Sequence, residues 1–326
     1  GRRVLRPEAG AAGSLAMLRL TNRERAFRGS REYDGTYPSL HLNYNLTDRI
    51  TARFAYAKTL GRPDYVDIIP TATIDDNEAA DLNPALSPGT ITLSNTALKP
   101  WTADNFDLSL EYYFARGGLA SIGVFQKNLA DFWGRLNTPL TPELASTLGI
   151  EQAYIGWTVV TRINTGSAKI SGAEFNFTRP LDFLPGWARH FSVSANGTAL
   201  HLQGANSADF NRFISKTGNF SLSWNRKPVS ARVNFNYRGR QRNSAQTGAQ
   251  YGATAGFYEY YDSRYNIDVN AEYTLSRRVR LFVNARNILN QPQVLERYSP
   301  DSALYASGFR HEEFGVQYTL GLKGTF

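Results

Sequence analysis

The last stretch of the chain, residues 314–326, restricts the fold more than any other. It reads FGVQYTLGLKGTF, and apart from the glycines its apolar and polar side chains alternate from Phe314 to the terminal Phe326. Because successive side chains of a strand point to opposite sides, this pattern predicts a strand with one apolar and one polar face. Thirteen residues are long for a soluble sheet, where about five or six are usual. They suit a tilted strand that crosses a hydrocarbon layer, which needs about 9 to 11 residues.

The same alternation recurs along the chain and predicts about eleven strands. They cover residues 37–46, 50–59, 105–114, 119–133, 169–178, 191–202, 217–224, 229–240, 265–273, 279–289 and 314–326. Their connections alternate between short and long, as in antiparallel outer-membrane barrels with short periplasmic turns and long outer loops. The predicted fold is therefore an all-β transmembrane antiparallel β-barrel whose final strand ends at the periplasmic rim.

Composition agrees with a barrel and excludes other classes. No apolar run approaches the roughly 18 residues of a membrane-spanning helix, and the chain has no Cys for disulfides or thiolate metal sites. A soluble β-sandwich also alternates, but its inner face is a packed core. Here the polar face carries charges such as Arg53, Glu111, Arg232 and Glu272, which predicts a hydrated lumen wall instead.

The net charge of +8 is concentrated at the N-terminus. Residues 1–31 hold eight Arg and two acids, so the rest of the chain carries only +2. We interpret residues 1–36 as a basic extracellular loop or fragment end, and residues 37–326 as part of the barrel. A nucleic-acid-binding arm is the alternative, but the nearly neutral barrel argues against a nucleic acid partner.

Five segments together resemble the C-terminal barrel half of TonB-dependent outer-membrane receptors, particularly the group from Caulobacter- and Xanthomonas-like bacteria. They are YPSLHLNYNLTDRITARFAYAKTLGRPDY (37–65), LKPWTADNFDLSLEYYF with GVFQKNLADF (98–114 and 123–132), SGAEFNF (171–177), ARNILNQP (285–292) and YTLGLKGTF (318–326). Their joint order is specific, although any one alone is weak.

The resemblance implies a plugged barrel of about 22 strands in the bacterial outer membrane, in contact with lipid and lipopolysaccharide. It implies import of a scarce nutrient, such as a siderophore-iron complex, haem, cobalamin or an oligosaccharide, driven by TonB and its inner-membrane energising complex. It also implies that Phe326 is read as a barrel-assembly signal. The plug and half of the barrel are expected to come from outside this sequence, which we interpret as a fragment or as one chain of an assembly.

Candidate substrate contacts share an aromatic ring or a basic group and a place in a long loop or at its base. They are Trp101, Trp133, Trp157, Tyr258, Tyr260, Tyr261, Arg240, Arg242, Arg310 and His311. Aromatic faces stack on sugars or flat chelates, and Arg pairs with carboxylates or phosphates. The alternative is that these aromatic side chains pack loops or form girdles at the membrane interfaces.

Catalysis has little support, because the four His are scattered and no HExxH, G-x-S-x-G or P-loop pattern occurs. We predict no enzymatic activity, no cofactor and no metal site. The acids from Asp75 to Asp81 are interpreted as a solvated loop, with Ca²⁺ coordination as the alternative. Passive diffusion through a porin and a soluble carbohydrate-binding domain remain the alternative functions.

Closure of the barrel is constrained by strand direction. The strands at 37–46 and 314–326 are both expected to run toward the periplasmic rim, so pairing them directly would be parallel. Unpaired backbone groups are not tolerated in hydrocarbon. We therefore expect the two strands to pair with strands absent from this sequence, or to be left as open edges.

Overall fold

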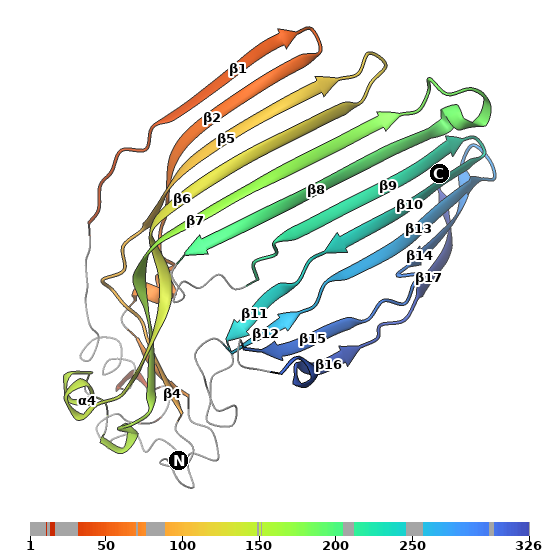
Figure 1. Cartoon of the computed structure of the whole chain (residues 1–326). Helices are drawn as coiled ribbons and strands as arrows, with labels where there is room; N and C mark the ends of the chain where they lie inside the picture. Colours follow the sequence, from red (N-terminus) through yellow and green to blue (C-terminus); the bar gives the residue numbers. More distant parts are fainter. Residues whose placement is uncertain are drawn as a thin grey trace.

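One curved antiparallel sheet dominates the molecule (Figure 1). The computed structural model describes residues 11, 14–16, 32–69, 71–75, 89–148, 150, 152–204, 212–245, 257–299 and 303–325. Within these residues the sheet follows eleven strands in chain order, which confirms the predicted all-β antiparallel fold. They are β1 (Ser39–Thr47), β2 (Ile50–Gly61), β5 (Trp101–Tyr113), β6 (Leu119–Pro139), β7 (Thr158–Pro180), β8 (Phe191–Gly204), β9 (Lys216–Arg226), β10 (Val229–Arg238), β13 (Arg264–Thr274), β14 (Val279–Arg286) and β17 (Gln317–Gly324).

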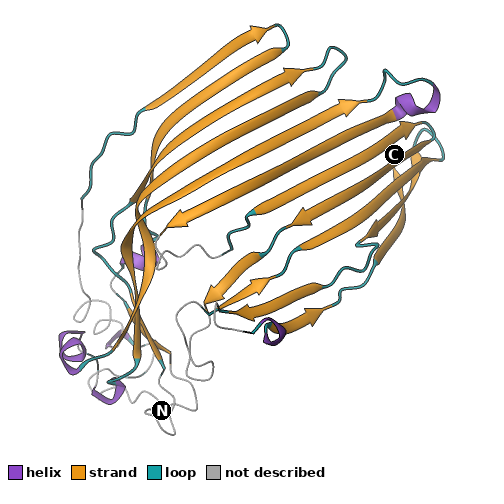
Figure 2. Ribbon diagram, viewed as in Figure 1, coloured by secondary structure: helices purple, strands orange, loops and turns teal. Residues whose placement is uncertain are grey.

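We call the end of the sheet with the long connections the loop end and the end with the short connections the turn end (Figure 2). The smaller elements lie at the loop end, with one exception. The exception is the 3-10 helix η4 (Gly186–His190), between β7 and β8 at the turn end. The others are α2 (Tyr65–Ile68), β3 (Ala72–Asp75), β4 (Thr90–Leu93), α4 (Pro142–Leu148), η3 (Gln152–Tyr154), β11 (Gln241–Ala245), β12 (Tyr258–Tyr261), β15 (Gln293–Tyr298), η6 (Leu304–Ala306) and β16 (Gly308–Glu312). No helix in the described residues is long and apolar enough to cross a membrane.

One face of the main sheet carries a band of apolar residues. Residues in register across β2, β5–β10 and β13 form one apolar row: Ile50, Tyr112, Ala120, Phe177, Ala195, Phe220, Phe235 and Ile267. A second row continues to the last strand: Val193, Leu222, Val233, Val269, Ala285 and Tyr318. Such a band is typical of a lipid-facing barrel wall.

The opposite face is polar and internally hydrogen-bonded. Five asparagines lie in register across β7–β10 and β13, namely Asn176, Asn196, Asn219, Asn236 and Asn266. Elsewhere on this face Arg53 binds the Glu111 carboxylate at 3.0 Å, and Lys323 forms an ion pair with Glu272. The predicted division between an apolar and a charged face therefore follows from the strand pairing itself.

Side chains at the turn end close the short connections. The Thr47 hydroxyl oxygen accepts hydrogen bonds from the backbone N–H groups of Arg49 and Ile50, at 3.2 and 3.1 Å. Ser276 accepts in the same way from Arg278 and Val279, at 3.2 and 3.1 Å. Such local bonds satisfy turn backbone groups, so each short turn fixes the register of its hairpin.

The predicted ends of β6 and β7 are wrong. The two strands extend over 21 and 23 residues, well beyond the roughly 9 to 11 that cross a membrane. Their outer ends form an arm that packs with β4, α4 and η3 around a buried core: Ile91, Leu140, Ala145, Trp157 and Val159. Strands that pair outside the membrane need not alternate apolar and polar residues. The alternating pattern in the sequence therefore ended before the strands themselves.

Further boundaries also differ from the prediction. The expected loops at 60–102, 241–260 and 290–310 contain β3 and β4, β11 and β12, and β15 and β16. The final strand begins at Gln317, because Gly315 before it has φ +73, outside the strand region. Phe326, the predicted assembly signal, lies outside the described residues.

The sheet has β1 and β17 at its two edges. Its order begins at β1 and ends at β17, and no pairing joins them within the part of the chain described. Both strands run from the loop end toward the turn end (Figure 1). The expectation that these two strands do not pair directly with each other is confirmed.

Candidate functional site

Beyond the loop end, the last four strands of the main sheet lead into a second sheet, here called the outer sheet. It has the order β11-β12-β15-β16 and lies next to β10, β13, β14 and β17 in Figure 1. Alternation along β11, β12 and β15 brings six residues together, and we call them the tyrosine–arginine cluster. They are Arg240, Arg242, Tyr258, Tyr260, Glu296 and Tyr298.

Arg240 connects most of this cluster. Its guanidinium group lies 4.1 Å from the ring centroid of Tyr260 and 5.5 Å from that of Tyr298. Nη2 of Arg240 donates a hydrogen bond to Oε2 of Glu296 at 2.8 Å. A cation held over aromatic faces and paired with a carboxylate has a defined orientation.

Arg242 extends the cluster along β11. It lies 4.6 Å from the ring centroid of Tyr258, and the rings of Tyr258 and Tyr260 are 6.4 Å apart in an edge-to-face arrangement. Burial raises the pKa of the Tyr260 hydroxyl, although the nearby Arg240 and Arg242 charges lower it in part. The hydroxyl therefore stays protonated at neutral pH and can donate a hydrogen bond.

The other face of the outer sheet is held by ion pairs. Arg297 lies 3.6 Å from Glu259 and stacks on Phe309 at 3.4 Å. Asn243 donates to Glu259 at 3.0 Å, and Leu295 is only 1% exposed. These contacts give the tyrosine–arginine cluster a rigid support.

Arg310 and His311 lie in β16, which pairs with β15. Arg310 pairs with Glu312 at 2.9 Å, and Nε2 of His311 lies 3.4 Å from Glu313. Tyr261 lies at the inner end of the outer sheet, where the Arg238 guanidinium is 5.5 Å from its ring. Of the ten predicted contacts, four are therefore in the cluster and three lie beside it in the outer sheet.

The three predicted tryptophans lie elsewhere. Trp101 packs near Phe132 at the start of β5, with 6.4 Å between ring centroids. Nε1 of Trp133 donates to the carbonyl oxygen of Lys99 at 2.8 Å. Trp157 is 3% exposed inside the arm core, a placement that favours loop packing over substrate contact for this residue.

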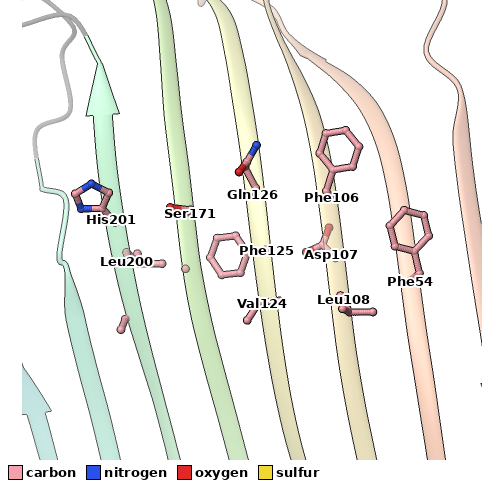
Figure 3. Close-up of a pocket in the computed structure, with 12 residues that line it drawn as sticks. Phe54, Phe106, Asp107, Leu108, Val124, Phe125, Gln126, Ser171, Leu200 and His201 are labelled. Atoms are coloured by element: carbon pink, nitrogen blue, oxygen red, sulfur yellow. The ribbon is translucent and has the colours of Figure 1, made fainter.

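A pocket of about 580 Å³ lies along β2 and β5–β8 at mid-sheet (Figure 3). Phe125 and Leu200 reach from neighbouring strands toward Gly172, which has no side chain to occupy the space between them. Asp107 on β5 is the one acidic residue in its lining, and His201 lies on β8, on the other side of β6 and β7. The pocket is mainly apolar and lacks the convergent polar groups of the tyrosine–arginine cluster.

The described residues hold no group of three or more His, Asp and Glu side chains arranged to bind a metal. Of the acidic loop, Asp76, Glu78 and Asp81 lie outside the described residues, as does the side chain of Asp75. The tyrosine–arginine cluster offers aromatic faces, guanidinium groups and a carboxylate.

Comparison with models of protein families shows which family the chain is related to. The family model described as TonB dependent receptor-like, beta-barrel, matches residues 16–288. The chain belongs to the TonB-dependent receptor family. No curated protein matches the sequence.

Solved receptor structures share the fold of this TonB-dependent receptor chain. The ferric enterobactin receptor of Pseudomonas aeruginosa superimposes with a TM-score of 0.63 at 18% identity, over 89% of this chain and 40% of that one. The siderophore receptor PirA of Acinetobacter baumannii gives 0.60 at 18%, over 89% and 41%. The copper transporter OprC gives 0.56 at 14%, over 88% and 39%. The chain thus spans about two fifths of the length of these receptors.

Sequence reasoning missed Glu296 and Tyr298 of the tyrosine–arginine cluster. Both lie in β15, inside a segment expected to be a loop. The signal was present in the run QVLERY at 293–298, which has the β-branched and aromatic residues of a strand. Nothing local in the sequence indicates that this receptor segment pairs with β12.

Proposed function

We propose that the protein is an outer-membrane importer of a scarce small-molecule nutrient, energised through TonB, and that the tyrosine–arginine cluster contacts the imported compound. The observation that carries this proposal is the position of the cluster, at the loop end of a sheet that carries an apolar band on one face. Long loops are the extracellular side of such barrels. Membership of the family supports the import role.

A siderophore-iron complex is the substrate class we favour. The structural relatives include two named siderophore receptors, and rings of Tyr258, Tyr260 and Tyr298 beside two Arg suit a flat, anionic chelate. Haem, cobalamin and oligosaccharides are the other classes that the family resemblance implies. The Caulobacter- and Xanthomonas-like subgroup rests on the sequence segments alone.

Energised uptake separates import from passive diffusion. In cells that depend on this protein for iron, accumulation of ⁵⁵Fe-loaded siderophore should stop when TonB is deleted or a proton uncoupler is added. Arg240→Ala with Tyr260→Ala should lower cell-surface binding of the siderophore, whereas Arg116→Ala, in the exposed turn between β5 and β6, should not. Accumulation that is unaffected by loss of TonB would favour a porin.

We also propose that the loop end is extracellular, that residues 1–36 are a basic extracellular loop or fragment end, that the apolar band contacts lipid and lipopolysaccharide, and that the C-terminus is periplasmic. Because the chain has no Cys, single cysteines report accessibility without background. Tyr305→Cys, at a side chain 95% exposed near β16, should react with an impermeant maleimide on intact cells. Asp48→Cys, in the β1–β2 turn, should react only after the outer membrane is opened; the reverse pattern would invert the orientation. The role of Phe326 in assembly remains a prediction.

A further inference from the structure

Two arginines face each other where the main sheet meets the outer sheet. Arg238, the last residue of β10, lies directly opposite Arg264, the first residue of β13. Guanidinium groups carry their charge throughout the physiological pH range. Like charges in directly opposed cross-strand positions are destabilising, so this pair needs a counter-charge.

Several N–H donors of this pair are buried without an acceptor. Nε and Nη2 of Arg238 and Nε of Arg264 have no hydrogen-bond partner among the described residues. Nη2 of Arg264 donates to the carbonyl oxygen of Gln291 at 3.1 Å, which is a neutral group. A charged donor that is buried and unpaired is costly, so these donors point to an acceptor that the described chain does not supply.

Neighbouring arginines are paired with acids. Arg240 pairs with Glu296, Arg297 with Glu259 and Arg310 with Glu312, at 2.8, 3.6 and 2.9 Å. Neither Arg238 nor Arg264 has a carboxylate within 4.0 Å in the part of the chain described. Unlike these three arginines, Arg238 and Arg264 have buried donors and no acidic partner among the described residues.

The acids closest in sequence are occupied. Oδ1 of Asp268, on β13, accepts a hydrogen bond from the backbone N–H of Asn287 at 2.9 Å. Oδ1 of Asp262 accepts from the backbone N–H of Ser263 at 2.6 Å. Both carboxylates therefore have roles in fixing loops.

Aromatic rings lie beside both guanidinium groups. Arg238 lies 5.5 Å from the ring centroid of Tyr261, and Arg264 lies 5.8 Å from that of Phe314. An aromatic ring beside a guanidinium group does not accept at its N–H edge, so Nε and Nη2 of Arg238 would still suit a planar, bidentate acceptor. A carboxylate or a phosphate has this geometry.

We propose that Arg238 and Arg264 together bind one oxyanion, a carboxylate or phosphate group, at the inner end of the outer sheet. The role of this site in transport rests on the proposed function: the two arginines would bind an anionic group of the imported compound after that compound has contacted the tyrosine–arginine cluster. The transported class is then an anionic chelate, in preference to a neutral oligosaccharide.

The test is anion-dependent thermal stability of the protein purified from outer membranes in detergent. Sodium phosphate and sodium acetate are titrated separately, with sodium chloride as the control at equal ionic strength. Phosphate or acetate should raise the unfolding midpoint saturably, by about 2 to 4 °C when the site is filled. The double variant Arg238→Gln with Arg264→Gln should lose this shift, and the control Arg116→Gln, in the exposed turn between β5 and β6, should keep it.

A second variant covers the case in which the double variant does not fold. Arg238→Lys keeps the charge but loses the bidentate edge, so it should need about tenfold more anion for half of the shift. An absent shift in the wild type, or an equal shift in Arg238→Lys, would overturn the proposal. Uptake is measured independently, so a saturable anion shift without TonB-dependent accumulation would retain this site and reject the import role.

Discussion

Val283 and Asn284 are neighbours in β14 that face opposite sides of the sheet. Val283 lies in register with Ala271 and Leu320 on the apolar face, and Asn284 with Asn270 and Thr319 on the polar face. Val283→Arg should cost about 2 to 4 kcal/mol at mid-membrane, whereas Asn284→Arg should cost little. A refolding titration in lipid measures both, and equal costs would contradict the assigned faces.

Gly172 is needed for close packing between β6 and β8. A Cβ at this position would lie 2.8 Å from the Ala199 carbonyl oxygen and equally close to Leu200 and Phe125. Gly172→Ala should therefore destabilise the protein by about 1 to 3 kcal/mol. Gly123→Ala is the matched control, because its nearest contact would be an ordinary 3.6 Å. Chemical unfolding of the two variants should separate them, and equal midpoints would argue against the tight packing.

At the scale of elements, the arm is a small folded unit with its own core. β4 pairs in parallel with β7, and α4 and η3 cover the junction around Trp157. Nη1 of Arg162 on β7 binds Asp67 of α2 at 2.6 Å. The arm therefore depends on packing of chain segments that are distant in sequence.

Trp157→Ala should unfold the arm without unfolding the main sheet. Loss of a buried Trp side chain costs about 3 to 5 kcal/mol, more than a small unit of this kind is expected to tolerate. Hydrogen exchange should then become fast in β4 and at the outer end of β7, while β9 and β10 stay protected. Trp187→Ala, at a side chain 65% exposed, should leave the pattern unchanged. Loss of protection throughout the sheet would mean that the arm is not independent.

At the scale of the whole molecule, the two edge strands have the same direction. β1 and β17 both run toward the turn end, so joining them would require a parallel pair, whereas neighbouring strands on the path from β1 to β17 are antiparallel. An odd number of additional strands between them would give antiparallel pairing at both edges. The barrel of about 22 strands that the family resemblance implies meets this condition, and remains a proposal.

Cysteine pairs test this edge assignment in membranes. Asn284→Cys with Thr319→Cys, which are in register on β14 and β17, should form a disulfide on mild oxidation. Asn43→Cys on β1 with Thr319→Cys should not, because those strands are at opposite edges. Efficient crosslinking of residues 43 and 319 would mean that the eleven strands close on themselves.

Some features follow from the sequence alone. The two faces of each strand, the eleven strands of the main sheet and the sorting of short turns from long loops were all predicted. The physical reason is that each depends on neighbours one or two residues away: lipid on one side and water on the other impose alternation at every position. Arg240, Arg242, Tyr258 and Tyr260 were also chosen as candidates from the sequence, because it placed them in a long loop or at its base. Their role in substrate contact stays a prediction.

Only the tertiary structure decided which of these residues meet. Arg240 reaches Glu296 across 56 residues of sequence, and Arg238 faces Arg264 because of the register between β10 and β13. Trp157 was expected in a loop and is buried, because β4, α4 and η3 close over it. These contacts depend on the pairing of strands whose own sequences are equally compatible with other partners, so local periodicity carries no information about them.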